Sequence, residues 1–173
     1  RFVAPPAQEV AIRAGRLFDA RTGALLTNQI ILVKGDRIAE VGAGVQIPRG
    51  ARVVDLSAAT VLPGMIDTHV HVNTGGDTPA ERALIALTNA QIDLEAGFTS
   101  VLDMDSRGGF NTVELRDAID AGLVAGPRMQ VVGQSLNQRA GRYYPDNQSL
   151  RFLEGFTENK NVTTGEGGML ITN

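Results

Sequence analysis

The sequence predicts an α/β protein in which a small N-terminal β-sandwich-like domain precedes alternating strands and helices. Residues 8–60 contain short β-branched runs separated by turn residues, which is the pattern of strands. From residue 61 onward, short apolar runs alternate with segments whose apolar residues recur at helical spacing. Strand–helix–strand order implies parallel strands that are joined by right-handed crossovers.

The N-terminal domain is expected over residues 1–60, beginning with a Pro-rich arm at residues 1–7. Gly35-Asp36 lies between two apolar runs and predicts the turn of a β-hairpin. We expect a small antiparallel sheet that packs on the following domain and carries no chemistry. Its expected strands cover Glu9–Ala20, Gln29–Lys34, Arg37–Val41 and Ala51–Leu56.

The second domain is expected over residues 61–160 and begins with a strand that ends in two histidines. Thr78-Pro79-Ala80-Glu81 combines an N-cap, a first-turn proline and a capping-box glutamate, so a helix should start there and end at Gly97. Residues 161–173 are a Gly-rich tail with a weak strand pattern. The remaining expected elements are a strand at Thr99–Asp103, a helix with a second capping-box pattern at Asn111–Glu114, and a strand at Met129–Gly133.

The composition excludes several classes of function. Of 173 residues, 43% are hydrophobic and 20% are charged, as in an ordinary globular protein. The net charge of −3 and the lack of a basic cluster argue against a nucleic-acid partner. No apolar run approaches the roughly 20 residues that span a bilayer, so no membrane partner is expected. Without cysteine, a disulfide framework and a thiolate metal site are excluded.

The start of the chain bears on its compartment. It begins with Arg1 rather than Met and shows no signal-peptide pattern. This is consistent with removal of an export signal, although it does not require one. Two expectations stay open: a cytoplasmic protein, or a periplasmic or secreted protein after signal-peptide removal.

The only two histidines, His69 and His71, are the strongest candidates for chemistry. Side chains i and i+2 of a strand share a face, so the two rings can converge on one point. Imidazole is the commonest metal ligand, and two rings supply half a tetrahedral site or part of a binuclear one. Asp67 lies two residues earlier and is expected on the same face, either as a further ligand or as an acceptor that orients a ligand ring.

Four segments resemble one protein family. Leu62–His71 resembles the first-strand signature of the metal-dependent amidohydrolase superfamily, and Gly35–Gly42 resembles its N-terminal β-domain. Ala96–Val101 and Leu115–Arg128 resemble the branch of imidazolonepropionase-like amidohydrolases and Xaa-Pro dipeptidases. The resemblance spans about residues 8–160 and implies the first three β/α units of a TIM-type (β/α)₈ barrel. The barrel is incomplete, because closure takes about 200–250 residues.

The resemblance also implies an activity. In this family one or two divalent ions, often Zn²⁺, activate a water that attacks an amide carbonyl. His69 and His71 correspond to the first-strand metal ligands. The catalytic lysine, histidines and aspartate that the resemblance implies for later strands cannot be placed in this chain, and the histidines are absent, since none follows His71. We therefore expect the N-terminal portion of an amide hydrolase for small dipeptide-like substrates, inactive without the rest of the barrel.

A polar loop after the third expected strand supplies candidates for substrate binding. Arg139, Arg142 and Tyr143 lie within Gln134–Tyr144, which leaves the strand at its C-terminal end. An arginine at that position can bind a substrate carboxylate bidentately. The alternative is that these are solvated loop residues.

An incomplete barrel raises a second possibility for function. Its open sheet edge carries unpaired backbone groups, and apolar side chains such as Val101 and Val131 would lack partners. We expect a complementary C-terminal chain or a homo-oligomer to cover them. The alternative to an enzyme portion is a non-catalytic fragment that self-assembles, or pairs with a partner, through this edge.

Overall fold

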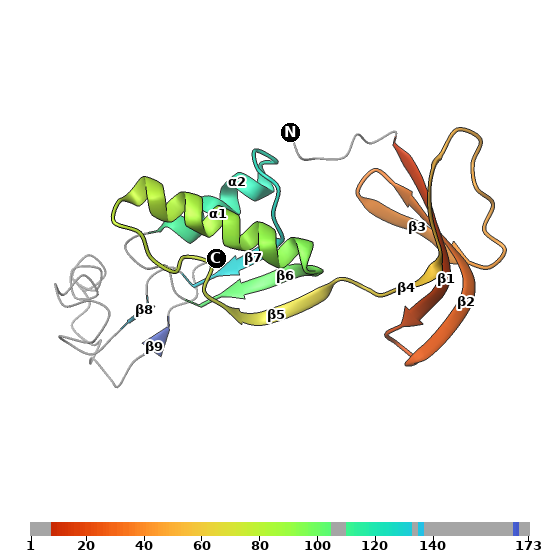
Figure 1. Ribbon diagram of the computed structural model, residues 1–173, viewed down its shortest axis with the longest axis horizontal. Coiled ribbons are helices and arrows are strands. Elements are labelled where there is room, and N and C mark those ends of the chain that lie inside the picture. The colour runs from red at the N-terminus through yellow and green to blue at the C-terminus, as the bar shows by residue number, and fades with distance from the viewer. Residues whose placement is uncertain (1–7, 105–109, 133–134, 137–167, 170–173) are drawn as a thin grey trace, which may run out of the picture. The chain divides into compact units, whose positions relative to one another are not determined.

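The computed structural model describes residues 8–104, 110–132, 135–136 and 168–169. The chain divides into two compact units, residues 1–64 and residues 65–173, and each is considered by itself (Figure 1). From residue 8 onward the regular elements of the first unit are all strands, and the second unit alternates strands and helices. The α/β class expected from the sequence is confirmed. No helix in the described ranges combines the length and the apolar character that crossing a bilayer requires.

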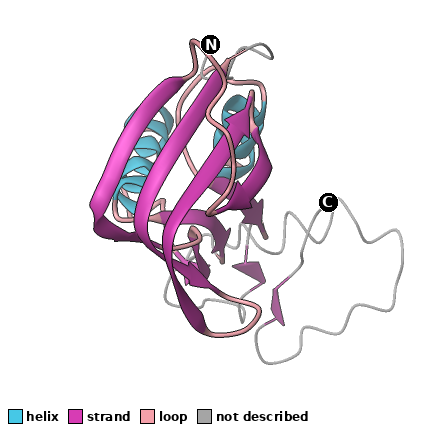
Figure 2. Ribbon diagram, turned by 90° about the vertical axis from the view of Figure 1, so that its right-hand side faces the viewer, coloured by secondary structure: helices cyan, strands magenta, loops and turns pink. Residues whose placement is uncertain are grey.

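The first unit is a four-stranded sheet with the order β3-β2-β1-β4. Figure 2 shows its strands side by side in one twisted layer. The β2–β3 hairpin turns at Gly35, whose φ of 59° favours glycine, so the turn predicted there is confirmed. The strands are β1 (Glu9–Asp19), β2 (Ala24–Lys34), β3 (Arg37–Gly42) and β4 (Arg52–Val61).

The expectation of an antiparallel sheet is wrong for β4. This strand pairs in parallel with β1, from Val10 opposite Arg52 to Leu17 opposite Val61. Residues 43–51 lead the chain from the end of β3 back to the end of the sheet where β1 begins. Strand β4 therefore enters the sheet in the direction of β1, a consequence of pairing that no local turn signal reveals.

Gly15 marks an irregularity between β1 and β4. The pairing shifts between Ala14, opposite Leu56, and Arg16, opposite Thr60. A Cβ atom at position 15 would lie 1.9 Å from the carbonyl oxygen of Ser57. Only glycine allows the two backbones to approach so closely, which is a typical reason for glycine inside a strand.

The second unit is built on a three-stranded parallel sheet with the order β5-β6-β7. Helices α1 and α2 connect the strands and lie on one face of the sheet (Figure 1). Strand–helix–strand–helix–strand is the arrangement expected for the start of a (β/α)₈ barrel. The elements are β5 (Met65–Val70), α1 (Pro79–Glu95), β6 (Phe98–Asp103), α2 (Asn111–Asp120), β7 (Arg128–Val131), and a short antiparallel pair, β8 (Ser135–Leu136) and β9 (Gly168–Met169).

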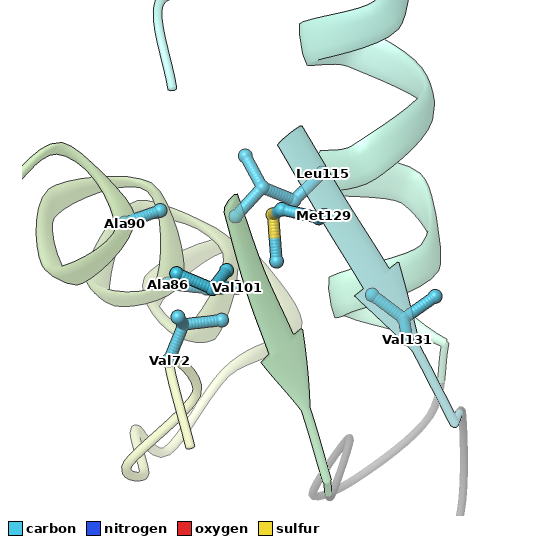
Figure 3. Packing of buried hydrophobic residues seen from close by; sticks show 7 residues of the cluster. All are labelled: Val72, Ala86, Ala90, Val101, Leu115, Met129 and Val131. Atoms are coloured by element: carbon cyan, nitrogen blue, oxygen red, sulfur yellow. The ribbon is translucent and has the colours of Figure 1, made fainter. Parts of the chain in front are cut away.

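The core of this unit lies between the sheet and the helices. Val101 and Val131 are 3% and 2% exposed and belong to this core, so the expectation that they lack partners is wrong. They point to the helix layer, whereas Ile66 on β5 is 69% exposed. The core side chains, shown in Figure 3, are Val72, Ala86, Ala90, Val101, Leu115, Met129 and Val131.

The two helices differ in how they begin. The hydroxyl of Thr78 accepts the N–H of Glu81 at 3.2 Å, so the predicted N-cap of α1 is confirmed. The Glu81 carboxylate accepts the N–H of Asp77 at 2.8 Å and completes the cap. Helix α2 starts one residue earlier than its capping pattern suggests, because Asn111 already lies inside it. Its N-cap is Phe110, which makes no side-chain cap bond.

Replacing Thr78 with alanine should lower the free energy of unfolding by about 1 kcal/mol, because the N–H of Glu81 loses its acceptor. Urea denaturation measures the difference. Thr88→Ala is the matched control, since the Thr88 hydroxyl bonds only back to the Leu84 carbonyl of the same helix. Alanine is the stronger helix former, so this control should not lose stability. Equal losses in both variants would contradict the capping role.

Candidate metal centre

His69 and His71 converge at the C-terminal end of β5. Their Nε2 atoms lie 3.3 Å apart. The ring centroids are 5.1 Å apart, and the ring planes meet at 78°. Both side chains are exposed. The prediction that the two rings point to one side at the end of a parallel strand is confirmed.

The separation of the two nitrogens fits a shared metal ion. Two nitrogens that bind one tetrahedral zinc at about 2.0–2.1 Å lie roughly 3.3–3.4 Å from each other. The distance between the His69 and His71 Nε2 atoms matches this value. Within the described ranges, no group of three or more His, Cys, Asp or Glu side chains is placed to hold a metal. The pair therefore fits two corners of a coordination site.

Asp67 does not share the face of the histidines, which corrects the expectation from simple alternation. It pairs with Val101, whereas Val70 pairs with Asp103, so β5 carries one extra residue between them. Such a bulge breaks the period of two. Paired residues in neighbouring parallel strands point to the same face of the sheet. Asp67 therefore points, like Val101, toward the helix layer.

Asp67 nevertheless contacts His69, through the backbone. Its Oδ1 atom accepts the His69 N–H at 2.9 Å. The expected contact with a histidine ring is replaced by a contact that fixes the backbone position of the histidine. An acidic side chain two residues earlier accounts for the bond, since Asp commonly accepts an N–H from position i+2.

A second carboxylate lies near Asp67, on α1. Burial, and next the negative charge of Asp67, raise the pKa of Asp93 above its usual value. This interaction agrees with the placement of Asp67 on the helix side of the sheet. It also means that ionised Asp93 destabilises the fold.

Asp93→Asn should raise the melting temperature at neutral pH, because it removes a charge that the fold disfavours. A carboxyl with a raised folded-state pKa lowers stability as the pH rises through its titration. The gain should therefore fade in acid, where Asp93 is protonated in both the folded and unfolded states. Thermal unfolding at pH 7 and at pH 3 tests this. A gain of the same size at both values would exclude the electrostatic cause.

Two side chains hold the peptide groups next to His71. Asp103, at the end of β6, accepts the N–H of Val72 on Oδ1 at 3.0 Å and is fully buried. Asn89 of α1 donates from Nδ2 to the Val72 carbonyl oxygen at 2.8 Å. The sequence places Asp103 at the end of an expected strand but does not predict its bond to Val72. An acidic residue that ends an apolar strand beside the histidines is the signal that was present.

The candidates for substrate binding fall in a part of the chain that the structure does not describe. Arg139, Arg142 and Tyr143 lie outside the described residues. Their expected contact with a substrate carboxylate stays a prediction.

Known proteins match this chain over part of their length. The profile described as "Amidohydrolase family" matches residues 60–169. The dihydroorotase of Geotalea daltonii is 35% identical over 95 residues, which make up 55% of this chain and 21% of that protein. The chain thus spans about a fifth of this relative's length.

Two solved structures resemble the fold. A Xaa-Pro dipeptidase with methionine bound in its active site has a TM-score of 0.71 and 28% identity, over 82% of this chain and 37% of that one. A prolidase complexed with N-methylphosphonate-L-proline has a TM-score of 0.67 and 31% identity, over 78% and 34% of the two chains. The chain spans about a third of each of these structures.

Proposed function

The chain belongs to the amidohydrolase family, and we propose that it is the N-terminal portion of a metal-dependent hydrolase that cleaves amide C–N bonds. The observation that carries this proposal is the 3.3 Å separation of the His69 and His71 Nε2 atoms, which suits two ligands of one ion. The similar dihydroorotase, dipeptidase and prolidase support hydrolytic chemistry in general.

The proposed cofactor is one or two divalent ions, with Zn²⁺ as the first candidate. When bound, the ion supplies a Lewis acid and an activated water. His69 and His71 would hold one ion through Nε2. The chain's own contribution is to keep two imidazoles converged, which reduces the ordering that binding must otherwise enforce. Further donors would come from outside the described residues, which offer no third one.

The proposed substrates are small molecules with an amide bond, dipeptide-like ones first. The likeness to a Xaa-Pro dipeptidase and to a prolidase supports this class. Arg139, Arg142 and Tyr143 are proposed to contact a substrate carboxylate. A complementary C-terminal portion, or a second copy of the chain, is the proposed partner that completes the half-barrel.

The proposal predicts a difference between this chain alone and the complete protein. The complete protein should contain zinc, hydrolyse dipeptides in a panel that includes Xaa-Pro substrates, and lose activity to a chelator. This chain alone should show neither turnover nor tight zinc binding, because two imidazoles are an incomplete ligand set. Calorimetric zinc titration and a coupled hydrolysis assay measure both properties.

Two outcomes would overturn the proposal. Activity that persists after complete metal removal would exclude metal-dependent hydrolysis. Sub-micromolar zinc binding by this chain alone would show that it holds further ligands.

Intact mass spectrometry first establishes whether a second polypeptide of about 200–250 residues, the size of a barrel, accompanies the chain. Self-assembly without hydrolysis would favour the non-catalytic alternative.

A further inference from the structure

We propose that Asp103 is a positioning residue of the metal centre, which acts with Asn89 through the peptide groups of Val72 to fix the ring of His71. The inference rests on the proposed function, because it assigns a role toward the same ion. Neither Asp103 nor Asn89 is expected to touch the ion or the substrate.

The first observation is where the regular strand pairing ends. The N–H of Met104 donates to the Val70 carbonyl oxygen at 2.9 Å, and β5 stops at Val70. His71 therefore lies one residue past the strand. A metal ligand at such a place needs another source of rigidity, because a loop backbone is more mobile than a strand.

The second observation is that Val72 is fixed through its N–H, its carbonyl oxygen and its side chain. Asp103 Oδ1 accepts its N–H at 3.0 Å, and Asn89 Nδ2 donates to its carbonyl oxygen at 2.8 Å. Its side chain is 1% exposed and belongs to the core. The N–H that Asp103 accepts belongs to the peptide that joins His71 to Val72. Fixing this peptide restricts the backbone of His71 on its C-terminal side.

The third observation is a parallel with the other histidine. Asp67 Oδ1 accepts the N–H of His69 at 2.9 Å. Asp67 thus accepts the N–H of His69 itself, and Asp103 accepts the N–H of the residue that follows His71. Asp103 is fully buried, and burying a carboxylate is costly unless it is well bonded.

The test is metal binding by the complete protein and its variants. Metal-free samples are titrated with Co²⁺, followed by visible absorption, and with Zn²⁺, followed by calorimetry. Asp103→Ala should lower the affinity for both ions by about 10–100-fold, as the loss of a ligand's support commonly does. Asp103→Asn should lose less, because its amide oxygen can still accept the Val72 N–H. Equal losses in the two variants would overturn the role of this bond.

Leu115→Ala is the matched control for a merely structural effect. Leu115 is 7% exposed in the same core, so its truncation destabilises the unit without touching the Val72 peptide. Its metal affinity should equal that of the wild type. A loss in Leu115→Ala as large as in Asp103→Ala would overturn the inference. Should Asp103→Ala fail to fold, Asn89→Ala removes the other bond at a half-buried side chain and must then lower the affinity.

A readout without metal separates the two proposals. In the metal-free protein, the imidazole NMR signals of His71 should shift or broaden in Asp103→Ala and stay unchanged in Leu115→Ala. Unchanged signals in Asp103→Ala would overturn the positioning role, even if the wild type binds metal. If the wild type binds no metal at all, the proposed function fails, and the role toward the ion fails with it.

Discussion

His69→Ala and His71→Ala should each abolish amide hydrolysis by the complete protein. Each change removes one of the two imidazoles that converge to 3.3 Å. Loss of a direct ligand should lower the metal affinity by more than the roughly 10–100-fold that is typical when a residue supporting a ligand is lost. Zinc content by elemental analysis should fall together with activity. The measurements are turnover of a dipeptide substrate and bound metal per protein.

Thr68→Ala is the matched control for the histidine variants. Thr68 is an exposed residue of β5 and lies directly before His69. Its truncation should leave activity within about twofold, in keeping with the small effects of surface changes. A histidine variant that keeps both its zinc and its turnover would contradict the proposed metal centre.

Gly15→Ala should destabilise the first unit by about 3 kcal/mol or more. The added methyl group would meet the Ser57 carbonyl oxygen at 1.9 Å, and this oxygen belongs to the backbone rather than to a flexible side chain. Overpacking a well-packed site costs about 1–3 kcal/mol, and a clash that parts two strands belongs at the upper end or beyond. Thermal unfolding and limited proteolysis of residues 1–64 would report the loss.

Gly44→Ala is the control for this prediction. Gly44 lies in the connection between β3 and β4, and nothing lies within 4 Å of a Cβ atom placed there. Its effect should stay within about 0.5 kcal/mol, as for most surface substitutions. If Gly15→Ala were equally mild, the close approach of β1 and β4 would not be required for stability.

Local patterns predicted much of the fold. The cap at Thr78 and the turn at Gly35 depend on residues close in sequence, so the sequence signal was sufficient. The convergence of His69 and His71 followed from their spacing, because two residues span one full period of a strand. These features depend on geometry that neighbouring residues determine among themselves.

Features that depend on distant partners could not be predicted in the same way. The parallel pairing of β4 and the bulge that turns Asp67 away from the histidines are properties of register between strands. Register depends on the whole sheet rather than on one strand. The bond from Val72 to Asp103 joins residues 31 positions apart, so no local motif predicts it. The sequence therefore indicated the hairpin and the order of the parallel strands, but not the register between strands that are distant in sequence.

The bulge in β5 has a consequence for the order in which the protein assembles and takes up its metal. With Asp67 turned to the helix layer, the described residues offer a divalent cation two imidazole nitrogens and no third donor. We expect two imidazoles alone to hold an ion too weakly to nucleate the folding of the half-barrel, unlike the full ligand set of a zinc finger. We expect polypeptide assembly to come first and metal loading to follow, so that bound zinc marks a barrel that has already closed. Adding chelator during refolding should then leave the folding rate unchanged and prevent only the gain of activity.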